Sequence, residues 1–311
     1  MKIVFMGTPQ FAVPSLDILI ENGFDIVGVI TAPDRLGGRG RDKLIESDVK
    51  KYAVSKGLKI LQPTNLKNES FLSELKSLNA DLQIVVAFRM LPVVVWDMPP
   101  LGTYNLHGSL LPAFRGAAPI NWAIMSGAEV TGLTTFKLKH EIDTGDMAFQ
   151  TEVPITQEDT AGTLHDTMMI KGSELILKTV KAIENNNLEL QAQDNSKVSK
   201  APKIFHDTCE IDFSKDVIEI YNHIRGLSPY PLSWMNFMGK KMKIIFGTPI
   251  VEKHNHTPSE VISDYKSYMH LVCKGGYIDI EEVQYEGKKR MKTKDFLNGM
   301  GAKMRTISPQ E

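Results

Sequence analysis

Residues 2–9, KIVFMGTP, decide the fold of the first half of the chain. The run is short, apolar and partly β-branched, and it stops at Gly7, a pattern typical of a buried strand that turns directly into a helix. Pro14 suits the first turn of that helix, because no backbone N–H is needed there. The turn after Gly7 lacks the G-x-G-x-x-G spacing that lets a backbone approach a pyrophosphate, which disfavours a nicotinamide or flavin site.

Similar apolar runs follow along the first part of the chain, and amphipathic stretches separate them, most clearly at 42–56 and 159–183. This alternation predicts an α/β fold in which crossover helices cover a parallel, Rossmann-like sheet. We expect this domain to span residues 1–190. The further strands expected in it are DIVGVI at 25–30, DLQIVVAF at 81–88, the segment 103–106, and GLTTFKL at 132–138.

The remainder of the chain has a different pattern. Residues 191–206 are polar with little apolar periodicity, which predicts a linker between domains. Residues 207–311 begin with a helix-like stretch near 214–226 and continue as short β-rich runs, at 233–238, 241–246, 268–273 and 277–285. Glycine turns such as Met238-Gly239-Lys240 and Gly275-Gly276 separate these runs. Several short strands in such a length predict a small OB-like β-barrel.

The composition is that of an ordinary globular protein, with 311 residues of which 42% are hydrophobic and 23% charged. No run reaches the roughly 18 apolar residues that a membrane span needs, and the start of the chain lacks the features of an export signal. We therefore expect a cytoplasmic protein without membrane contact. Cys209 and Cys273 have no metal-ligand spacing and are too few for a disulfide framework, so we expect two structural thiols and no metal.

Polar residues of catalytic type interrupt the strand end within TYNLHGSLLPAFRGAAPINWAI, residues 103–124. Asn105 and His107 are two apart, so an extended chain projects both to one face, at the carboxyl end where open sheets bind ligands. Downstream, the turn-forming DTGD at 143–146 is able to aim a carboxylate back at His107. Taken singly, each of these groups also fits a satisfied structural role or a helix cap.

Two motifs together, NLHGSLLPAFRG at 105–116 and DTGD at 143–146, resemble those of the folate-dependent formyltransferases. The resemblance implies a catalytic triad of Asn105, His107 and Asp143. It also implies a folate-contacting segment and a pterin-binding loop, which are Ser109, Leu110, Leu111 and Pro112, and Arg89, Met90 and Leu91, respectively.

Within that family the resemblance is greatest to the branch that formylates methionyl-initiator-tRNA. It extends from FMGTPQFAVPSL at 5–16, through PDRLGGRG at 33–40, to EVQYEGKKRM at 282–291. It implies 10-formyltetrahydrofolate as co-substrate, initiator Met-tRNA as acceptor, and a monomer. One departure precedes DTGD, where the family has a glycine and an apolar residue and this chain has KHEI. We expect His140 there to be a loop residue and not a catalyst.

Basic residues provide candidate contacts for the tRNA. The stretch 31–44 is rich in glycine and arginine, which predicts a mobile basic loop, and the resemblance implies that it contacts RNA. A second patch, GKKRMKTK at 287–294, lies in the predicted barrel. The candidate residues are Arg39, Arg41, Lys43, Lys288, Lys289 and Arg290. A solvated surface remains an alternative for both, and the net charge of −1 predicts local, salt-sensitive binding.

Two other functions remain open at this stage. The same triad is able to formylate a different amine, such as that of a sugar nucleotide or ribonucleotide, and only the second domain and the basic loop argue against this. In the other alternative, the protein binds RNA through its barrel and has no catalytic activity, and its α/β domain is a degenerate scaffold. The intact set of Asn105, His107 and Asp143 disfavours the second alternative, because a scaffold needs no polar groups aimed at one point.

Overall fold

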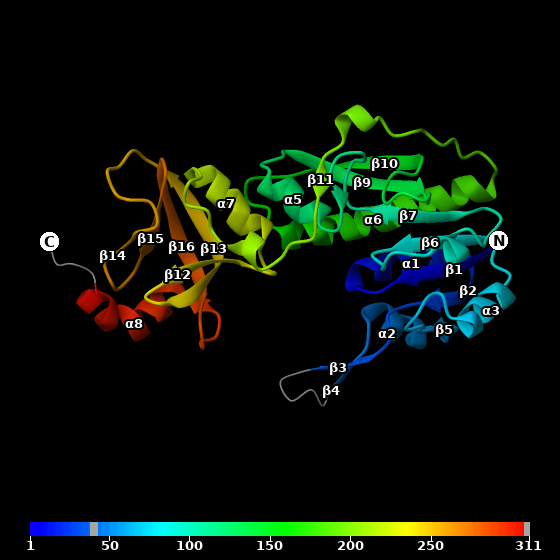
Figure 1. Ribbon diagram of the computed structural model, residues 1–311, viewed down its shortest axis with the longest axis horizontal. Coiled ribbons are helices and arrows are strands. Elements are labelled where there is room, and N and C mark those ends of the chain that lie inside the picture. The colour runs from blue at the N-terminus through cyan, green and yellow to red at the C-terminus, as the bar shows by residue number, and fades with distance from the viewer. Residues whose placement is uncertain (38–42, 308–311) are drawn as a thin grey trace. The chain divides into compact units, whose positions relative to one another are not determined.

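The computed structural model describes residues 1–37 and 43–307, with side chains described up to Met300. Contacts divide the chain into two compact units (Figure 1). The first unit contains Met1–Gly116, Thr131–Pro154 and His165–Ala201. The second contains Ala117–Val130, Ile155–Leu164 and the chain from Pro202 onward. Two short internal segments, 117–130 and 155–164, therefore pack with the C-terminal part of the chain.

The first unit is built on a seven-stranded sheet in the order β10-β9-β7-β6-β1-β2-β5. The strands β1, β2, β5, β6 and β7 pair in parallel, as the sequence predicts. Their bounds, with those of β9 and β10, are Lys2–Gly7, Asp25–Ile30, Ile60–Leu61, Leu82–Val86, Thr103–His107, Val130–Lys137 and Met147–Pro154.

One strand departs from the predicted parallel arrangement. β9 runs antiparallel to β7, with His107 opposite Thr134. The connection between them contains helix α5 (Pro119–Met125), which packs with the elements of the second unit. Without a crossover the chain returns antiparallel, and an antiparallel edge on a parallel sheet is common.

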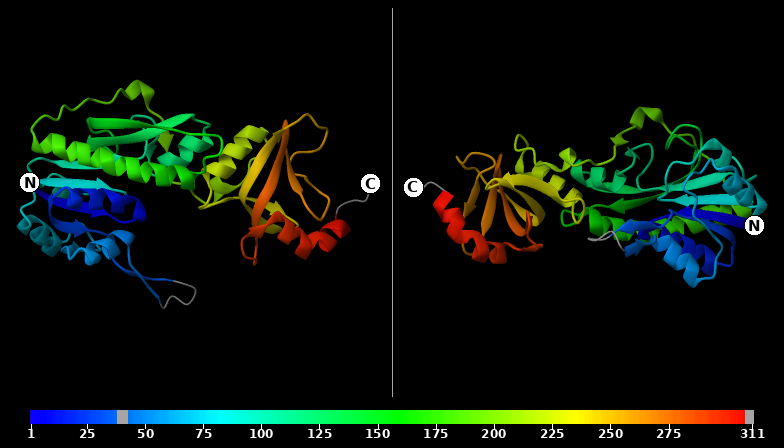
Figure 2. Two further views of the ribbon diagram at one scale, coloured as in Figure 1. Left: turned by 180° about the vertical axis from the view of Figure 1, so that it is seen from behind. Right: turned by 60° about the horizontal axis from the view of Figure 1, so that its bottom comes forward.

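The centre of the sheet is covered on both faces, since the β1 side chains from Ile3 to Met6 are all fully buried. Val4 and Met6 pack with Phe71 and Leu75 of α3 (Glu69–Ser77). Helix α6 (Ala161–Glu184) lies along the sheet (Figure 2). It packs on β7 and β9, since a Cβ at Gly172 would lie 2.7 Å from Leu106 and 3.6 Å from Leu133. Strands buried on both faces have continuous apolar runs, which explains KIVFM. The other short elements are η1 (Gln10–Ala12), α1 (Val13–Glu21) and α4 (Val93–Trp96).

The predicted helix at 42–56 and the predicted loop at 31–44 both differ from the structure. Helix α2 is shorter (Asp48–Ser55), because Ser47 caps it by accepting a hydrogen bond from the Lys50 N–H at 3.0 Å. The residues before the cap form β4 (Lys43–Ile45), which pairs with β3 (Arg35–Gly37). The described arms of the basic loop are therefore a hairpin.

The second unit contains a strongly curved antiparallel sheet in the order β12-β13-β16-β15-β14, with β17 also paired to β16. The path is open among the described strands, so the predicted barrel is a half-barrel. The turn between β12 and β13 has the positive φ angles, 50° and 73°, that Met238-Gly239 predicts. The bounds of β12 to β17 are Ser233–Phe237, Lys240–Val251, Val261–Ser263, Met269–Cys273, Gly276–Tyr285 and Met291–Lys292.

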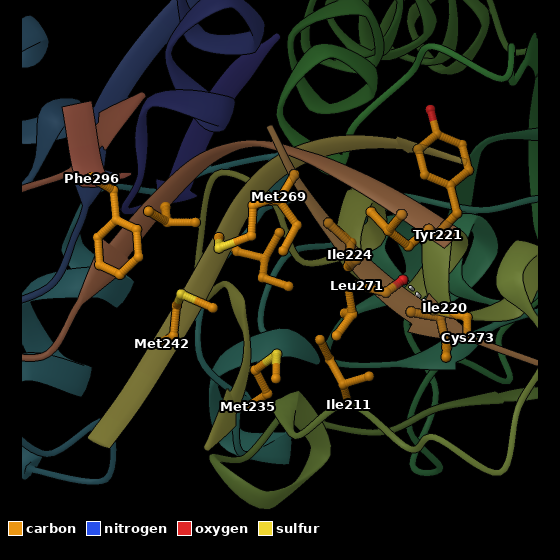
Figure 3. Close-up of a cluster of buried hydrophobic side chains, with 14 of the residues drawn as sticks. Ile211, Ile220, Tyr221, Ile224, Met235, Met242, Met269, Leu271, Cys273 and Phe296 are labelled. Carbon is orange, nitrogen blue, oxygen red and sulfur yellow. Dashed lines mark hydrogen bonds between the residues drawn. The ribbon is translucent and has the colours of Figure 1, made fainter. Parts of the chain in front are cut away.

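Helices close the concave side of this sheet. Tyr221 and Ile224 of α7 (Val217–Gly226) and Phe296 of α8 (Thr293–Ile307) pack in one core with Met242 and Leu271 (Figure 3). Both cysteines are buried and unpaired. Helix α5 packs on α7 in the same unit, where the Asn121 side-chain amide donates to the Gly226 carbonyl at 2.7 Å. The remaining elements are β8 (Arg115–Gly116), η2 (Asn195–Lys197), β11 (Lys200–Ala201) and η3 (Asp207–Cys209).

Candidate active site

The candidate site lies at the carboxyl ends of the central strands. The strand order reverses between β1 and β6, and open sheets bind ligands outside such a reversal. Gly7 ends β1 opposite Val86 of β6, and a Cβ at Gly7 would lie 3.1 Å from the Val86 carbonyl oxygen. The next strand, β7, ends at His107. The architecture thus brings the polar motif to the edge where a ligand would bind.

Asn105 and His107 lie two residues apart on β7 and share one face of it, as predicted. Asn105 is half-buried, and no described side chain or backbone group hydrogen-bonds its amide. His107 is 6% exposed, and its Nε2 lies 3.0 Å from the Phe114 carbonyl oxygen. Because a carbonyl only accepts, this contact requires the hydrogen on Nε2. Nδ1 is left facing a carboxylate.

That carboxylate belongs to Asp143, whose Oδ2 lies 3.9 Å from His107 Nδ1. The distance suits an ion pair but exceeds that of a hydrogen bond. The same oxygen accepts a hydrogen bond from the Gly116 N–H at 3.0 Å. Asp143 has a positive φ of 56°, a conformation that costs less for aspartate than for most side chains.

The second aspartate of DTGD has a different role. Asp146 pairs with Lys139 at 2.7 Å, and its carbonyl accepts the Lys137 N–H at 2.9 Å. Gly145 lies against β9, where a Cβ would be 1.7 Å from the Lys137 carbonyl oxygen. His140 packs edge-on against Trp96 with ring centres 5.5 Å apart. Of the two carboxylates, the one that faces His107 is Asp143.

The backbone of the segment from Ser109 to Pro112 is held by hydrogen bonds from two side chains. Thr134 donates to the Ser109 carbonyl at 2.7 Å and accepts from the Leu111 N–H at 3.0 Å. Gln150 donates to the Leu111 carbonyl at 2.9 Å. Ser109 is fully buried and donates to the Ala113 carbonyl, and the Leu111–Pro112 peptide is cis. Thr134 and Gln150 could not be found from the sequence, since their residue types carry no signal without the register of β9 and β10.

The predicted pterin-binding loop follows β6, the neighbour of β7. Arg89 donates to the carbonyl oxygens of Thr64, at 2.9 Å, and Pro63. Met90 is 75% exposed, whereas Leu91 packs against the core behind the loop. Arg89 therefore anchors the loop, and Met90 is its exposed apolar side chain.

A further residue, Gln193, was missed because it lies in the expected linker. Its Oε1 accepts hydrogen bonds from Arg115 Nε at 3.0 Å and Nη2 at 2.6 Å. Its Nε2 donates to the carbonyl oxygens of Asp143 at 2.9 Å and Gly145 at 2.8 Å. Nearby, β11 pairs in parallel with β8. Part of the polar stretch at 191–206 is thus ordered against the site.

The candidate basic residues are distributed over both units. Lys43 is exposed on β4, while Arg39 and Arg41 lie outside the described residues. In the second unit Lys288, Lys241 and Lys243 line a cavity of about 310 Å³ with Gln284, Tyr285, Glu286 and Gly287. Lys289 is exposed, whereas Arg290 contacts both oxygens of Glu282 at 2.6 and 2.7 Å. Lys288 and Lys289 are therefore the more available cations of this patch.

Residues 1–37 and 43–307 contain neither a metal-binding cluster nor a helix able to span a membrane. No group of three or more His, Cys, Asp or Glu side chains among them is arranged to hold a metal ion. Within the same residues, no helix has the length and apolar character needed to cross a membrane.

The sequence is similar to known proteins over nearly its whole length. The family described as formyl transferase matches residues 1–180, and the formyl transferase C-terminal domain matches residues 203–301. A relative from Parabacteroides distasonis, named methionyl-tRNA formyltransferase, is 49% identical over 309 residues, covering 96% of this chain and 95% of the relative. One of the same name from Flavobacterium johnsoniae is 50% identical over 305 residues, covering 96% of each.

Solved structures share the fold at lower identity. The N-formyltransferase from Helicobacter canadensis, in complex with folinic acid and dTDP-3-aminofucose, aligns with a TM-score of 0.70 and 24% identity, covering 92% of this chain and 99% of that one. HypX from Aquifex aeolicus, in complex with tetrahydrofolic acid, aligns with a TM-score of 0.65 and 16% identity, covering 97% of this chain and 48% of that one.

Proposed function

The chain belongs to the formyl transferase family, and we propose that it transfers a formyl group from 10-formyltetrahydrofolate to the amino group of methionyl-initiator-tRNA. Relatives named methionyl-tRNA formyltransferase are about half identical over 96% of the chain. The N-formyltransferase crystallised with an amino-sugar nucleotide is 24% identical, a level that supports the common fold alone. Formylation of a sugar or ribonucleotide amine is therefore not favoured.

The observation that carries the catalytic assignment is the convergence of Asn105, His107 and Asp143 at one strand end. Attack of a neutral amine on the formyl carbon creates an oxyanion and an ammonium group, so the site must stabilise one charge and remove one proton. The Asn105 amide has unused donors, and one such donor to an oxyanion is typically worth about 3 kcal/mol. We assign Asn105 to the oxyanion.

His107 and Asp143 act as a pair in this proposal. The Phe114 carbonyl fixes the imidazole through Nε2, so a second proton on Nδ1 would give an imidazolium 3.9 Å from the Asp143 carboxylate. That positive charge supports the oxyanion, and Asp143 accepts the proton lost by the amine, directly or through water. No thiol serves as nucleophile, since both cysteines are buried in the second unit, so transfer is direct.

For the folate we propose the segment from Ser109 to Pro112 together with the loop at Arg89, Met90 and Leu91. The first is rigid, because Thr134 and Gln150 hold its backbone. The second presents the exposed Met90 side chain on an anchored loop. A rigid segment with polar backbone groups and an exposed apolar side chain suit a flat heterocycle that has hydrogen-bonding edges. Family members use folate-derived formyl donors, and two structural neighbours are described with bound folates.

For the tRNA we propose the domain at 207–311 and the basic hairpin. Lys241, Lys243 and Lys288 gather around one cavity, where cationic side chains are able to contact backbone phosphates. Lys289 and Arg290 extend this patch. Lys43 of the hairpin supplies a further contact, together with Arg39 and Arg41, which lie outside the described residues. Because these contacts are ionic, binding should weaken as the salt concentration rises.

The test is transfer of labelled formyl from 10-formyltetrahydrofolate to purified initiator Met-tRNA, run beside free methionine, an amino-sugar nucleotide and a reaction without acceptor. We expect formylation of the Met-tRNA alone, with loss of activity in His107→Ala. Formate release without transfer would indicate a hydrolase instead, and absence of folate turnover would reject the enzymatic function.

The tRNA surface is tested in the same assay. Lys241→Ala combined with Lys288→Ala should raise the KM for Met-tRNA, with kcat largely unchanged. Lys266→Ala is the matched control, because Lys266 is an exposed lysine of the same unit outside the cavity. Equal KM values for the two variants would reject the cavity as a tRNA contact.

A further inference from the structure

We propose that Gln193 is a positioning residue for formyl transfer, acting through Asp143. Its side-chain amide joins the backbone of the DTGD loop to the segment that holds the Asp143 carboxylate. The inference rests on the proposed function, because it assigns to Asp143 the proton-accepting role described above.

All hydrogen-bonding capacity of this amide is used. The two N–H groups of Gln193 are donated to the carbonyl oxygens of Asp143 and Gly145, at 2.9 and 2.8 Å. The Oε1 atom accepts two N–H groups of Arg115. A primary amide has two donors and two acceptor positions, so no capacity is left over. A side chain with this number of partners from two separate segments is held in one orientation.

The chemistry of the partners requires an amide. Two carbonyl oxygens need donors, which a carboxylate lacks, and the Arg115 guanidinium needs an acceptor, which an ammonium group lacks. Glutamate would keep the contact with Arg115 but bring a negative oxygen against the carbonyl oxygens of Asp143 and Gly145. The two halves of the Gln193 contact are therefore separable by substitution.

The Gln193 side chain influences both the backbone and the side chain of Asp143. On the backbone side, Asp143 has φ of 56°, and the Gln193 bond to its carbonyl fixes the peptide that follows. On the side-chain side, the carboxylate is held by the N–H of Gly116, the residue after Arg115. Because Gln193 binds Arg115 as well, one amide sets the Asp143 backbone and the segment that orients its carboxylate.

Small displacements matter here. The Asp143 carboxylate stands 3.9 Å from the imidazole of His107, and a misplacement of about 1 Å at a catalytic group is able to lower a rate about 100-fold. Gln193 is too far along the chain to be recognised as part of the site, since it follows Asp143 by 50 residues. Because Gln193 acts on the position of Asp143 and not on a substrate, its substitution should lower kcat and leave the affinity for both substrates unchanged.

The experiment compares Gln193→Glu and Gln193→Met with Gln191→Ala in the full-length protein. Gln191 is the matched control, because its side chain is exposed and its pairing with Met147 is made by the backbone. We expect both Gln193 variants to lose about 10- to 100-fold in kcat, with both KM values within about threefold, while Gln191→Ala stays near the wild type. Thermal melting identifies any variant that does not fold. If Gln193→Met does not fold, the kcat of the isosteric Gln193→Glu variant tests the inference.

A double-variant cycle separates positioning from general damage. If Gln193 acts through Asp143, adding Gln193→Glu to Asp143→Asn should lower kcat by less than about threefold further. If the losses of kcat in the two single variants multiply in the double variant, the inference is overturned. A kcat of Gln193→Glu within about twofold of the wild-type value would also overturn it. A rise in KM with unchanged kcat would also overturn it. Failure of the wild-type protein to formylate Met-tRNA would instead reject the proposed function.

Discussion

The backbone N–H of Gly116 donates to the carboxylate of Asp143 at 3.0 Å. This bond joins the end of NLHGSLLPAFRG to the start of DTGD, so the two motifs are one structural assembly. The carboxylate oxygen that accepts this bond is the one that faces His107. Its orientation is therefore set by the backbone of the other motif.

Asp143→Asn should abolish most activity without unfolding the protein. The amide oxygen of asparagine can still accept the Gly116 N–H, but it cannot take the proton lost by the amine. We expect kcat to fall by about 10²- to 10⁴-fold. Asp146→Asn is the control, because its carboxylate pairs with Lys139 and should affect kcat little. Single-turnover formyl transfer and thermal melting measure both properties, and comparable kcat values would reject the assignment of Asp143.

Gly145→Ala tests how closely the DTGD loop packs on β9. A Cβ at this position would lie 1.7 Å from the Lys137 carbonyl oxygen, so the backbone must move. Because the same loop carries Asp143, we expect at least about tenfold loss of kcat. Gly299→Ala in α8 is the control, since a Cβ there meets nothing within 4 Å. An unchanged rate in Gly145→Ala would mean that the loop tolerates displacement.

Arg225→Met should destabilise the second unit. The Arg225 side chain is 2% exposed, and its guanidinium donates to the carbonyl oxygens of Thr156 and Asp159 and to the Asn222 side chain. Removing it leaves the buried Asn222 side chain and the Asp159 carbonyl without this donor and leaves a gap where the buried guanidinium packed, which should cost about 3 kcal/mol of unfolding free energy. Arg290→Ala removes a surface ion pair with Glu282 and should cost less than about 1 kcal/mol. Denaturant unfolding compares the two, and equal losses would contradict the account.

His223 should make the second unit sensitive to acid. Burial lowers the pKa of His223, and its Nε2 atom is buried without a hydrogen-bond partner in the described part of the chain. Above about pH 6.5 the imidazole is neutral in both the folded and unfolded states and has no effect. Below that pH the unfolded chain binds a proton that the folded state does not, so the unfolding free energy falls as pH falls.

The measurement is the change in melting temperature between pH 7.5 and 5.5 for wild type and His223→Gln. We expect a smaller acid-induced decrease in the variant. An equal decrease in both proteins would mean that other groups dominate the acid response of this unit.

Much of this architecture follows from local sequence. KIVFMGTP predicts β1 because a strand buried on both faces has an uninterrupted apolar run, and the two-residue spacing of Asn105 and His107 gives their shared face. The antiparallel β9 could not be predicted, because its direction depends on where α5 packs. Nor could the late start of α2, which Ser47 determines by capping.

The residues that hold the site in place could not be predicted from local sequence, for a different reason. Thr134, Gln150 and Gln193 contact it across separations of 23, 39 and 50 residues, respectively. Polar residues of these types are common on any surface, and only the sheet register and the returning chain bring them beneath the motifs. The catalytic triad itself stays a prediction, which the substitutions above test.

The position of Gln193 in the chain also has a consequence for biosynthesis. The ribosome adds Gln193 50 residues after Asp143, and β11 emerges later still. At translation rates of roughly 5–20 residues per second, this separation corresponds to roughly 3 to 10 s. Once Pro154 at the end of β10 has been added, the nascent chain contains every strand of the central sheet but still lacks the amide that binds the DTGD loop. The strands of the sheet are therefore all synthesised before the side chain that completes the hydrogen bonds of the DTGD loop.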